Sequence, residues 1–396
     1  MRSTYYDVVV AGHICLDITP KFSGEGKLDI GSILKPGKLL NVGDAVISTG
    51  GAVSNTGIAL SKLGCKVSYM SSVGDDEFGD IIIQKMARYG GVEGFLRNEQ
   101  ISSSYSVILA MPSIDRIILH NPGCNDYFSV KNIDWETVAS ARLFHLGYPP
   151  IMKSLYQNDG VELANILKTV KAMGISTSLD MALPDPNSEA GQMDWSEWFR
   201  NVLPYVDFFM PSIEEMLLFL DRDQWQKLRA LNIDFVDAVP IISYYDIAQK
   251  VLDLGCRVII LKAGHRGMYL KSSDSARMAA IKLLDADMIE SWTNRELWAA
   301  SYVIDTILSA TGSGDSAVAG ILTALLHSNS AEETLRWGNC LGYQNLRALD
   351  TVSGVGTYQE TQALLRTLRP ASLEFVDDSW LPTSSMDIWE RRQGHP

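Results

Sequence analysis

The 396-residue sequence predicts an α/β fold of three layers, in which helices cover both faces of a mainly parallel β-sheet and a small β-sheet lies beside them. Short strand-like runs alternate with helical segments from residue 64 onward, a pattern typical of parallel sheets. Two β-rich stretches, 14–46 and 97–125, stand outside this alternation and predict the separate sheet. Hydrophobic residues form 46% and charged residues 20% of the chain, which excludes a disordered or coiled-coil protein.

The individual elements follow from apolar spacing and from the glycines that interrupt it. A buried strand is predicted from an apolar run bounded by Gly12, and a helix begins at the pair Gly50 and Gly51 and ends before Gly64. In chain order, the predicted strands are 7–16, 67–73, 105–111, 116–120, 143–146, 176–180, 208–210 and 258–261, and the predicted helices are 50–63, 81–89, 160–173 and 315–326. The runs 105–111 and 116–120, separated by a turn at 112–115, predict a β-hairpin. Three irregular, charged segments are expected to be insertions or surface helices: 184–203, 221–243 and 271–298.

The chain is acidic, with 34 lysines and arginines against 47 aspartates and glutamates and a formal net charge of −13. Binders of nucleic acid and of anionic membranes depend on basic patches, so both functions are disfavoured. No apolar run is long enough to predict a transmembrane helix, and the first residues lack the features of a signal peptide. The five cysteines form no CxxC motif. We therefore expect a cytoplasmic protein without a disulfide framework or a structural zinc site.

The first chemical motif is Gly50-Gly51-Ala52-Val53-Ser54-Asn55 at the start of a predicted helix. Paired glycines let a ligand approach the backbone closely, and the helix start offers free N–H donors. The Asn55 amide supplies both a donor and an acceptor, as the recognition of a hydroxyl group requires. A plain strand-to-helix turn accounts for the glycines equally well, because Gly-Gly is common in turns.

The second motif is Thr311-Gly312-Ser313-Gly314-Asp315, directly before a long apolar helix. Small residues at 312–314 expose backbone N–H groups at a helix N-terminus, which predicts an anion site. Asp315 follows in the first turn, where the helix dipole favours a carboxylate of low basicity. From there it can accept a proton from a hydroxyl that attacks a phosphoryl group. The alternative interpretation is that Asp315 only caps the helix.

Two other nucleotide-binding signatures are absent. The sequence contains no GxxxxGK[ST], so a P-loop kinase is excluded on that signature. The glycines at 312 and 314 have no third glycine at the spacing of GxGxxG, which disfavours a dinucleotide enzyme.

The two motifs, in this order and widely separated in the chain, resemble the signatures of the PfkB (ribokinase-like) carbohydrate kinase family. The matching stretches are 50–60, 63–64, 73–79 and 311–320, with supporting matches at Gly12 and Asp17, 121–125, 211–215 and 264–267. The resemblance implies a ribokinase-like fold and an ATP- and Mg²⁺-dependent transfer of phosphate to a hydroxyl of a small sugar or sugar-like substrate. It divides the chain into an α/β core (1–13, 47–96 and 126–370), a β-lid over the sugar (14–46 and 97–125) and a C-terminal tail (371–396).

The resemblance also implies a role for each matching residue. Asp315 is the expected catalytic base, and Gly312, Ser313 and Gly314 are the expected anion hole. Asp17, Gly51 and Asn55 are expected to contact sugar hydroxyls, and Glu215 to organise Mg²⁺. Expected nucleotide contacts are Gly264, Gly267, Asn339 near the adenine, and Ser212, which stands where the family often has asparagine.

Two alternative functions stay open, and one protein partner is expected. A nucleoside kinase of the same family would take a ribose that carries a base. A non-catalytic sugar- or nucleotide-binding protein is the alternative from another class, motivated by departures such as Ser212. The resemblance allows a homodimer through the exposed edge of the β-lid.

Overall fold

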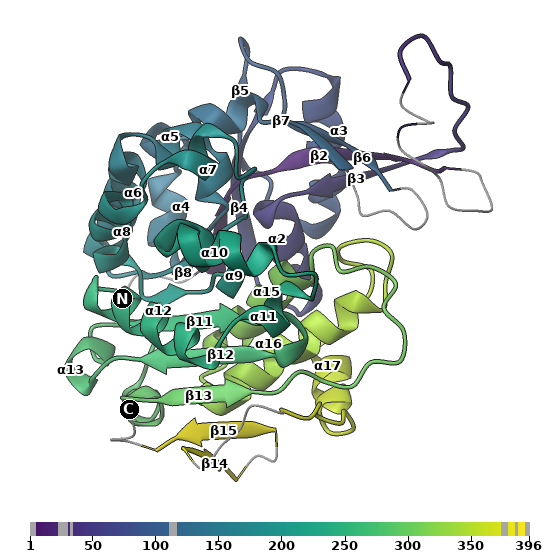
Figure 1. Cartoon of the computed structure of the whole chain (residues 1–396). Helices are drawn as coiled ribbons and strands as arrows, with labels where there is room; N and C mark the ends of the chain where they lie inside the picture. Colours follow the sequence, from purple (N-terminus) through teal and green to yellow (C-terminus); the bar gives the residue numbers. More distant parts are fainter. Residues whose placement is uncertain are drawn as a thin grey trace.

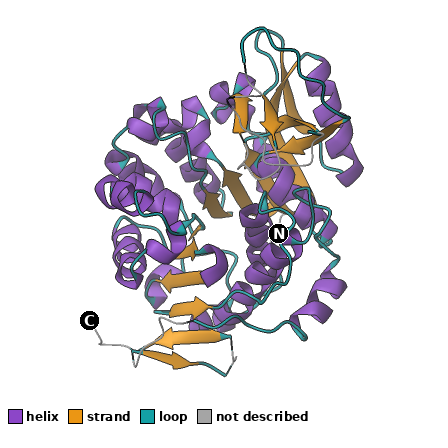
Figure 2. Ribbon diagram, turned by 45° about the vertical axis from the view of Figure 1, so that its right-hand side comes forward, coloured by secondary structure: helices purple, strands orange, loops and turns teal. Residues whose placement is uncertain are grey.

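A computed structural model describes residues 5–22, 31, 35–110, 117–373, 379–384 and 387–392. It confirms the predicted α/β arrangement, with helices on both faces of a large sheet and a small sheet to one side (Figures 1 and 2). Parts of the expected lid and tail, and the turn expected at 112–115, lie outside the described residues.

The main sheet is parallel over most of its width. Seven neighbouring strands, β11-β10-β9-β8-β1-β4-β5, run parallel, and β12, β13, β15 and β14 extend the β11 edge in antiparallel pairing. The strand bounds are β1 Tyr6–Gly12, β4 Val67–Gly74, β5 Gly94–Asn98, β8 Ala141–Gly147, β9 Ser176–Asp180, β10 Phe208–Phe209, β11 Val258–Lys262, β12 Met268–Ser272, β13 Glu296–Ala299, β14 Trp380–Pro382 and β15 Ile388–Arg391.

Successive residues of β1 belong to two different hydrophobic cores, because side chains alternate across a strand. Val8 and Val10 pack with helices that include α2, α3, α14, α15 and α16, whereas Val9 and Ala11 pack with α4, α6, α8, α9 and α12. The helix bounds are α2 Ala52–Lys62, α3 Glu77–Met86, α4 Trp135–Ala139, α5 Lys153–Tyr156, α6 Val161–Ala172, α7 Glu189–Gln192, α8 Ser196–Val202, α9 Ile213–Leu220, α10 Arg222–Arg229, α11 Phe235–Ala238, α12 Ile241–Asp253, α13 Ser275–Met278, α14 Ala286–Trp292, α15 Ser313–Leu326, α16 Ala331–Leu346 and α17 Tyr358–Leu365.

The small sheet has the order β3-β2-β6-β7 and projects from the body of the molecule (Figure 1). Its strands are β2 Cys15–Pro20, β3 Ala45–Gly50, β6 Tyr105–Leu109 and β7 Ile117–Asn121. β6 and β7 pair antiparallel, as predicted from the two runs at 105–120. β3 runs as far as Gly50, so the small sheet leads directly into the glycine pair that begins α2.

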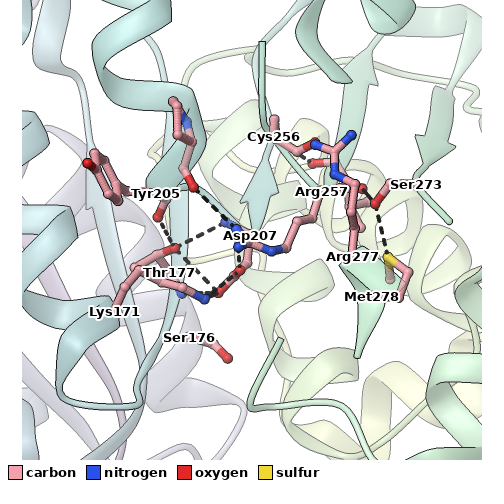
Figure 3. A network of polar contacts seen from close by, with 12 residues as sticks. Lys171, Ser176, Thr177, Tyr205, Asp207, Cys256, Arg257, Ser273, Arg277 and Met278 are labelled. Atoms are coloured by element: carbon pink, nitrogen blue, oxygen red, sulfur yellow. Dashed lines mark hydrogen bonds and ion pairs between the residues drawn. The ribbon is translucent and has the colours of Figure 1, made fainter. Parts of the chain in front are cut away.

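A buried carboxylate connects residues at the end of the main sheet where β9, β10 and β11 begin (Figure 3). Asp207 is fully buried and accepts hydrogen bonds from Lys171 Nζ at 2.7 Å and from the backbone N–H of Thr177 at 3.0 Å. The Arg257 guanidinium lies 3.1 Å away, so two cations contact this one carboxylate. This network lies at the opposite ends of the strands from the carboxyl ends, where ligands bind in open parallel sheets.

The predicted strand 7–16 is two strands in different sheets. Gly12 has a φ of 119°, and a Cβ at this position would lie 2.4 Å from the Gly147 carbonyl oxygen. The chain leaves the main sheet at this glycine and enters the small sheet as β2. The separate sheet predicted from residue 14 onward agrees with this change, whereas the prediction of a single strand over 7–16 is wrong.

Of the three segments expected to be insertions or surface helices, 221–243 contains the helices α10 and α11, which have no buried residue, whereas the other two contribute to the core. In 184–203, Trp195 and Trp198 are buried, and Trp198 Nε1 donates to the carbonyl oxygen of Leu155 at 3.0 Å. In the segment 271–298, strand β13 pairs with β12. Strand β15, which belongs to the expected C-terminal tail, pairs with β13. These short strands derive their place from long-range pairing, which local sequence does not specify.

Among the described residues, no helix combines the length and the apolar character needed to cross a membrane.

Candidate active site

Asp315 lies in the first turn of α15 and is only 3% exposed. The preceding Gly312 caps the helix with a φ of 74°, in the left-handed region that favours glycine. A Cβ at this position would lie 2.8 Å from the Thr351 side chain, so glycine is also required by the available space. The glycine-rich sequence therefore permits both the turn and the burial of the carboxylate.

Three side chains from other parts of the fold donate hydrogen bonds to the Asp315 carboxylate. Asn55 Nδ2, from α2, lies 2.9 Å from Oδ2, and the Tyr148 hydroxyl lies 2.7 Å from both oxygens. Thr56 Oγ1 lies 3.5 Å from Oδ1. Because α2 packs against α15, the two sequence motifs form one site.

Burial raises the pKa of Asp315, and the hydrogen bonds from Asn55 and Tyr148 oppose that rise. The expectation of low basicity from the helix dipole is therefore wrong, because desolvation outweighs it. Burial and the adjacent Asp315 raise the pKa of Tyr148 well above its usual value, so Tyr148 keeps its proton and donates. A buried carboxylate of raised basicity is suited to accept a proton.

Tyr148 holds an unusual backbone conformation beside Asp315. It follows β8 with φ 72° and ψ 37°, in the left-handed region that bulky residues rarely adopt. Such conformations persist where the surroundings enforce them and are concentrated at functional sites.

The backbone of 312–314 begins α15 beside Asp315, as predicted. The Ser313 N–H donates to the Ala310 carbonyl oxygen at 3.3 Å, and the Ser313 hydroxyl donates to the same oxygen at 2.9 Å. The N–H groups of Gly314 and Asp315 belong to the first helical turn, whose donors have no partners within the helix. These two donors are the best placed to receive an anion.

A cavity of about 420 Å³ lies in front of this helix start. Its lining includes Tyr148 and Asp180 together with these predicted site residues: Ser212, Glu215, Gly264, Gly312, Ser313, Gly314 and Asp315. A larger cavity of about 1000 Å³ is lined by paired charges around β12, β13 and β15 and includes no predicted site residue.

Asp180 and Lys262 form a buried ion pair in the smaller cavity. The Lys262 ammonium lies 2.6 Å from Asp180 Oδ1, with the two side chains 13% and 2% exposed. Burial raises the pKa of Asp180, although the Lys262 charge favours its ionised form. Burial disfavours the Lys262 ammonium, yet Asp180, Glu215 and Asp315 raise its pKa overall.

Glu215 and Ser212 form a capping box at the start of α9. The Ser212 N–H donates to Glu215 Oε2 at 2.7 Å, and the Glu215 N–H donates to Ser212 Oγ at 3.2 Å. Glu215 is 9% exposed and retains a second carboxylate oxygen beside the cavity. With Asp180 it forms the pair of oxygen donors that Mg²⁺ prefers, so these residues fit such an ion.

Gly267 and Asn339 lie outside the cavity lining and contact the backbone of Ala299 and Ala300. A Cβ at Gly267, where φ is 89°, would lie 2.0 Å from the Ala299 carbonyl oxygen. Asn339 Nδ2 donates to the carbonyl oxygens of Ala299 and Ala300, at 3.3 and 2.9 Å. Gly264 is the predicted loop residue that reaches the cavity.

The residues predicted to contact sugar lie where the small sheet meets α2. Gly51, with φ 88°, adjoins His13, whose Nδ1 would be 2.5 Å from a Cβ at residue 51. Asp17 lies on β2, and burial raises its pKa. His13 and His120 approach with their Nε2 atoms 3.4 Å apart, and burial and His120 lower the pKa of His13 to about 3.

Two buried polar atoms at this junction have no hydrogen-bond partner among the described residues: Asn55 Oδ1 and His13 Nδ1. Both Asn55 and His13 are at most 5% exposed. A buried polar atom without a partner is costly, so these two acceptors are available to a hydrogen-bond donor.

Sequence reasoning missed Asp180 and Lys262 and gave no role to Tyr148. Asp180 and Lys262 are the last residues of β9 and β11, and Tyr148 directly follows β8. The ends of these strands were predicted to within one residue. The rule that ligands bind at the carboxyl ends of parallel strands is the signal that identifies all three.

Comparisons with known proteins agree with this geometry. Residues 7–354 match the model of the family described as pfkB family carbohydrate kinase. An uncharacterized sugar kinase from Archaeoglobus fulgidus is 24% identical over 274 residues, which are 69% of this chain and 88% of that protein.

Among solved structures, similarity extends over nearly the whole chain. An Arabidopsis thaliana ribokinase complexed with ribose and ATP aligns with a TM-score of 0.67 and 16% identity, over 91% of this chain and 99% of that one. A fructokinase with bound ATP from Xylella fastidiosa aligns with a TM-score of 0.65 and 16% identity, over 91% and 98%. These similarities show a ribokinase-like fold.

Proposed function

The chain belongs to the pfkB family of carbohydrate kinases, and from this premise we propose that it transfers the terminal phosphoryl group of ATP to a hydroxyl of a small sugar or sugar-like molecule. One observation carries the proposal. The buried carboxylate of Asp315, bound by Asn55 of α2, lies beside the first-turn N–H groups of α15 at the wall of a single cavity.

In the proposed reaction, the acceptor oxygen forms a bond to the terminal phosphorus while the bond from that phosphorus to the bridging oxygen of ADP breaks. The proton of the acceptor hydroxyl passes to Asp315, whose pKa is raised by burial. Within the predicted anion hole of Gly312, Ser313 and Gly314, the free N–H of Gly314, together with the N–H of Asp315, stabilises negative charge on the phosphoryl oxygens, because the Ser313 N–H already donates to the Ala310 carbonyl oxygen. Each part of the site thus has one task in the transfer.

The nucleotide and its metal occupy the opposite wall in this proposal. Gly264 and Ser212 line that wall and offer backbone and hydroxyl groups to the phosphates. Glu215, together with Asp180, would hold Mg²⁺ or its water ligands, and the ion supplies charge neutralisation for the phosphates. Asn339 and Gly267 act from behind, because they fix the backbone around Ala299.

The acceptor binds, in this proposal, between α2 and the small sheet. Asp17, Gly51 and Asn55 contact its hydroxyls, and the unpartnered Asn55 Oδ1 and His13 Nδ1 accept hydrogen bonds from it. A neutral polyol satisfies these acceptors, because every hydroxyl can donate.

The small sheet is also proposed to pair with its copy in a second chain. Its strands β3 and β7 expose apolar side chains at Val46, Ile47, Ile118 and Leu119. Exposed apolar strand surfaces are typical of association sites. Sedimentation at two protein concentrations tests this, and a monomer at both contradicts it.

The experiment that tests the proposed activity is an acceptor screen. Mg·ATP is mixed with the protein and with pentoses, hexoses, polyols or nucleosides, and ADP release is recorded together with binding of ATP. We expect acceptor-dependent ADP release with at least one sugar or polyol. Turnover only with nucleosides would favour the nucleoside kinase, and ATP binding without acceptor-dependent release would favour a binding protein.

A further inference from the structure

The cavity that holds Asp315 also contains a buried lysine that the proposed mechanism does not use. Lys262 is the last residue of β11, and its side chain is 13% exposed. Among the described residues that line this cavity, Lys262 supplies the only cationic side chain, facing the carboxylates of Asp180, Glu215 and Asp315. A transferring phosphoryl group would bring further negative charge to this place.

The position of the ammonium relates it to the start of α15. A Cβ built on Gly314 would lie 3.6 Å from Lys262 Nζ. The ammonium therefore lies beside the first turn of α15, to which the N–H groups of the proposed phosphoryl site belong. Glycine at 314 leaves the space between the cation and the backbone free of side-chain atoms.

The need to neutralise Asp180 does not by itself explain why a lysine occupies this buried position. A buried ion pair contributes little net stability, because the desolvation of both charges offsets their attraction. Another largely buried lysine pair, Lys271 of β12 with Glu296 at 2.5 Å, lies at the other cavity, whose lining includes no proposed site residue. The location of Lys262, rather than its pairing, distinguishes it.

We propose that Lys262 contacts the terminal phosphoryl group of the nucleotide and stabilises its charge during transfer, and that Asp180 holds the ammonium in place before the nucleotide binds. This inference rests on the proposed kinase function. The lysine keeps all of its protons throughout, since the acceptor proton goes to Asp315. Its contribution is a fixed positive charge beside the backbone N–H groups, where developing charge is stabilised most effectively.

The test compares two nucleotides that differ in the terminal phosphoryl group. Dissociation constants for ADP and for the non-hydrolysable β,γ-imido analogue of ATP, each with Mg²⁺, are measured for wild type, Lys262→Met and Lys271→Met. We expect Lys262→Met to lose about tenfold or more of the preference for the analogue, with ADP affinity nearly unchanged, and to lose kcat. Lys271→Met, the matched control, keeps the wild-type preference.

A second variant separates contact with phosphate from simple neutralisation of Asp180. Lys262→Met leaves a buried carboxylate without its cation and reduces stability, so the pair is also removed together in Asp180→Asn/Lys262→Met. The inference predicts that this double variant still lacks the preference for the analogue, whereas Asp180→Asn alone, which loses the same proposed metal ligand but keeps the lysine, retains it. Recovery of the wild-type preference in the double variant, or its retention in Lys262→Met, would overturn the inference.

The same measurements distinguish this inference from the function on which it rests. A wild-type protein that binds neither nucleotide contradicts the proposed kinase function, and the inference is overturned with it. A wild-type protein that releases ADP in an acceptor-dependent way, together with variants of unchanged nucleotide preference, contradicts the inference alone.

Discussion

Replacing Tyr148 with phenylalanine removes a hydroxyl that donates to both carboxylate oxygens of Asp315, at 2.7 Å each. The aromatic ring stays, and Asp315 keeps its hydrogen bond from Asn55 at 2.9 Å. The variant therefore changes the electrostatic environment of one carboxylate and little else.

The direction of the effect follows from which protonation state the hydroxyl stabilises. Burial raises the pKa of Asp315, and the hydrogen bonds from Asn55 and Tyr148 oppose this by stabilising the ionised form. A hydrogen bond to a charged group contributes about 1.5–3 kcal/mol, and about 1.4 kcal/mol is tenfold in an equilibrium constant. In Tyr148→Phe, the ionised fraction of Asp315 at a given acidic pH should fall by about tenfold or more.

The assay is the pH dependence of kcat/KM for the acceptor, from about pH 5 to about pH 9, where the acid limb reports the base of the free enzyme. We expect that limb at higher pH in Tyr148→Phe than in wild type. Tyr302→Phe is the matched control, because Tyr302 is buried and donates to Asp387 at 3.2 Å away from the cavity. An acid limb of Tyr148→Phe at the wild-type pH, or at lower pH, would refute the reasoning.

Three further variants test the fold, the anion site and the metal site. Asp207→Ala leaves two partly buried cations without their carboxylate and should lower the free energy of unfolding by about 3 kcal/mol, measured by denaturant titration. Unchanged stability would contradict the role of the network in Figure 3. Gly312→Ala places a Cβ 2.8 Å from the Thr351 side chain at a φ of 74°, which should displace the loop before α15. We expect kcat to fall more than tenfold while the circular dichroism spectrum stays native. A wild-type kcat would show that the loop tolerates this displacement. Glu215→Gln keeps a side-chain oxygen for the capping box but removes the negative charge. Half-maximal activity should then require a higher Mg²⁺ concentration, while the melting temperature stays unchanged. An unaltered Mg²⁺ titration would contradict a role for Glu215 in binding the metal.

The two signature motifs and the helices that they begin could be predicted because their signals are local. Glycines at 51 and 312 adopt positive φ at the start of α2 and α15, as expected of glycines that precede a helix. Resemblance to the family then related Asn55 to Asp315, and the structure places the two side chains in contact. The assignment of catalytic and binding roles to them stays a proposal.

The contacts that the sequence did not predict depend on tertiary structure. Asp180, Lys262 and Tyr148 are single residues at the ends of separate strands, and no spacing between them in the chain indicates that they meet. Their proximity follows from the parallel sheet, which brings the carboxyl ends of β8, β9 and β11 to one edge.

Burial of polar and aromatic segments was equally hard to foresee. Trp198 lies in a charged stretch, yet it is fully buried. The segment Asn-Asp-Gly at 158–160 leaves room for its ring, and helix α5 supplies a carbonyl oxygen that accepts a hydrogen bond from its Nε1. The basicity of Asp315 was misjudged for the same reason. Both errors come from treating a residue as solvated when packing removes the solvent.

The most direct test of the central claim is the single-turnover rate of phosphoryl transfer in Asp315→Asn, with the acceptor found in the screen and with saturating Mg·ATP. The matched control is Asp287→Asn, an exposed aspartate in the first turn of α14. If Asp315 accepts the proton of the acceptor, Asp315→Asn should lose about a hundredfold or more of the rate while it binds ATP as wild type does. A rate within tenfold of wild type would contradict the assignment of Asp315 as the base.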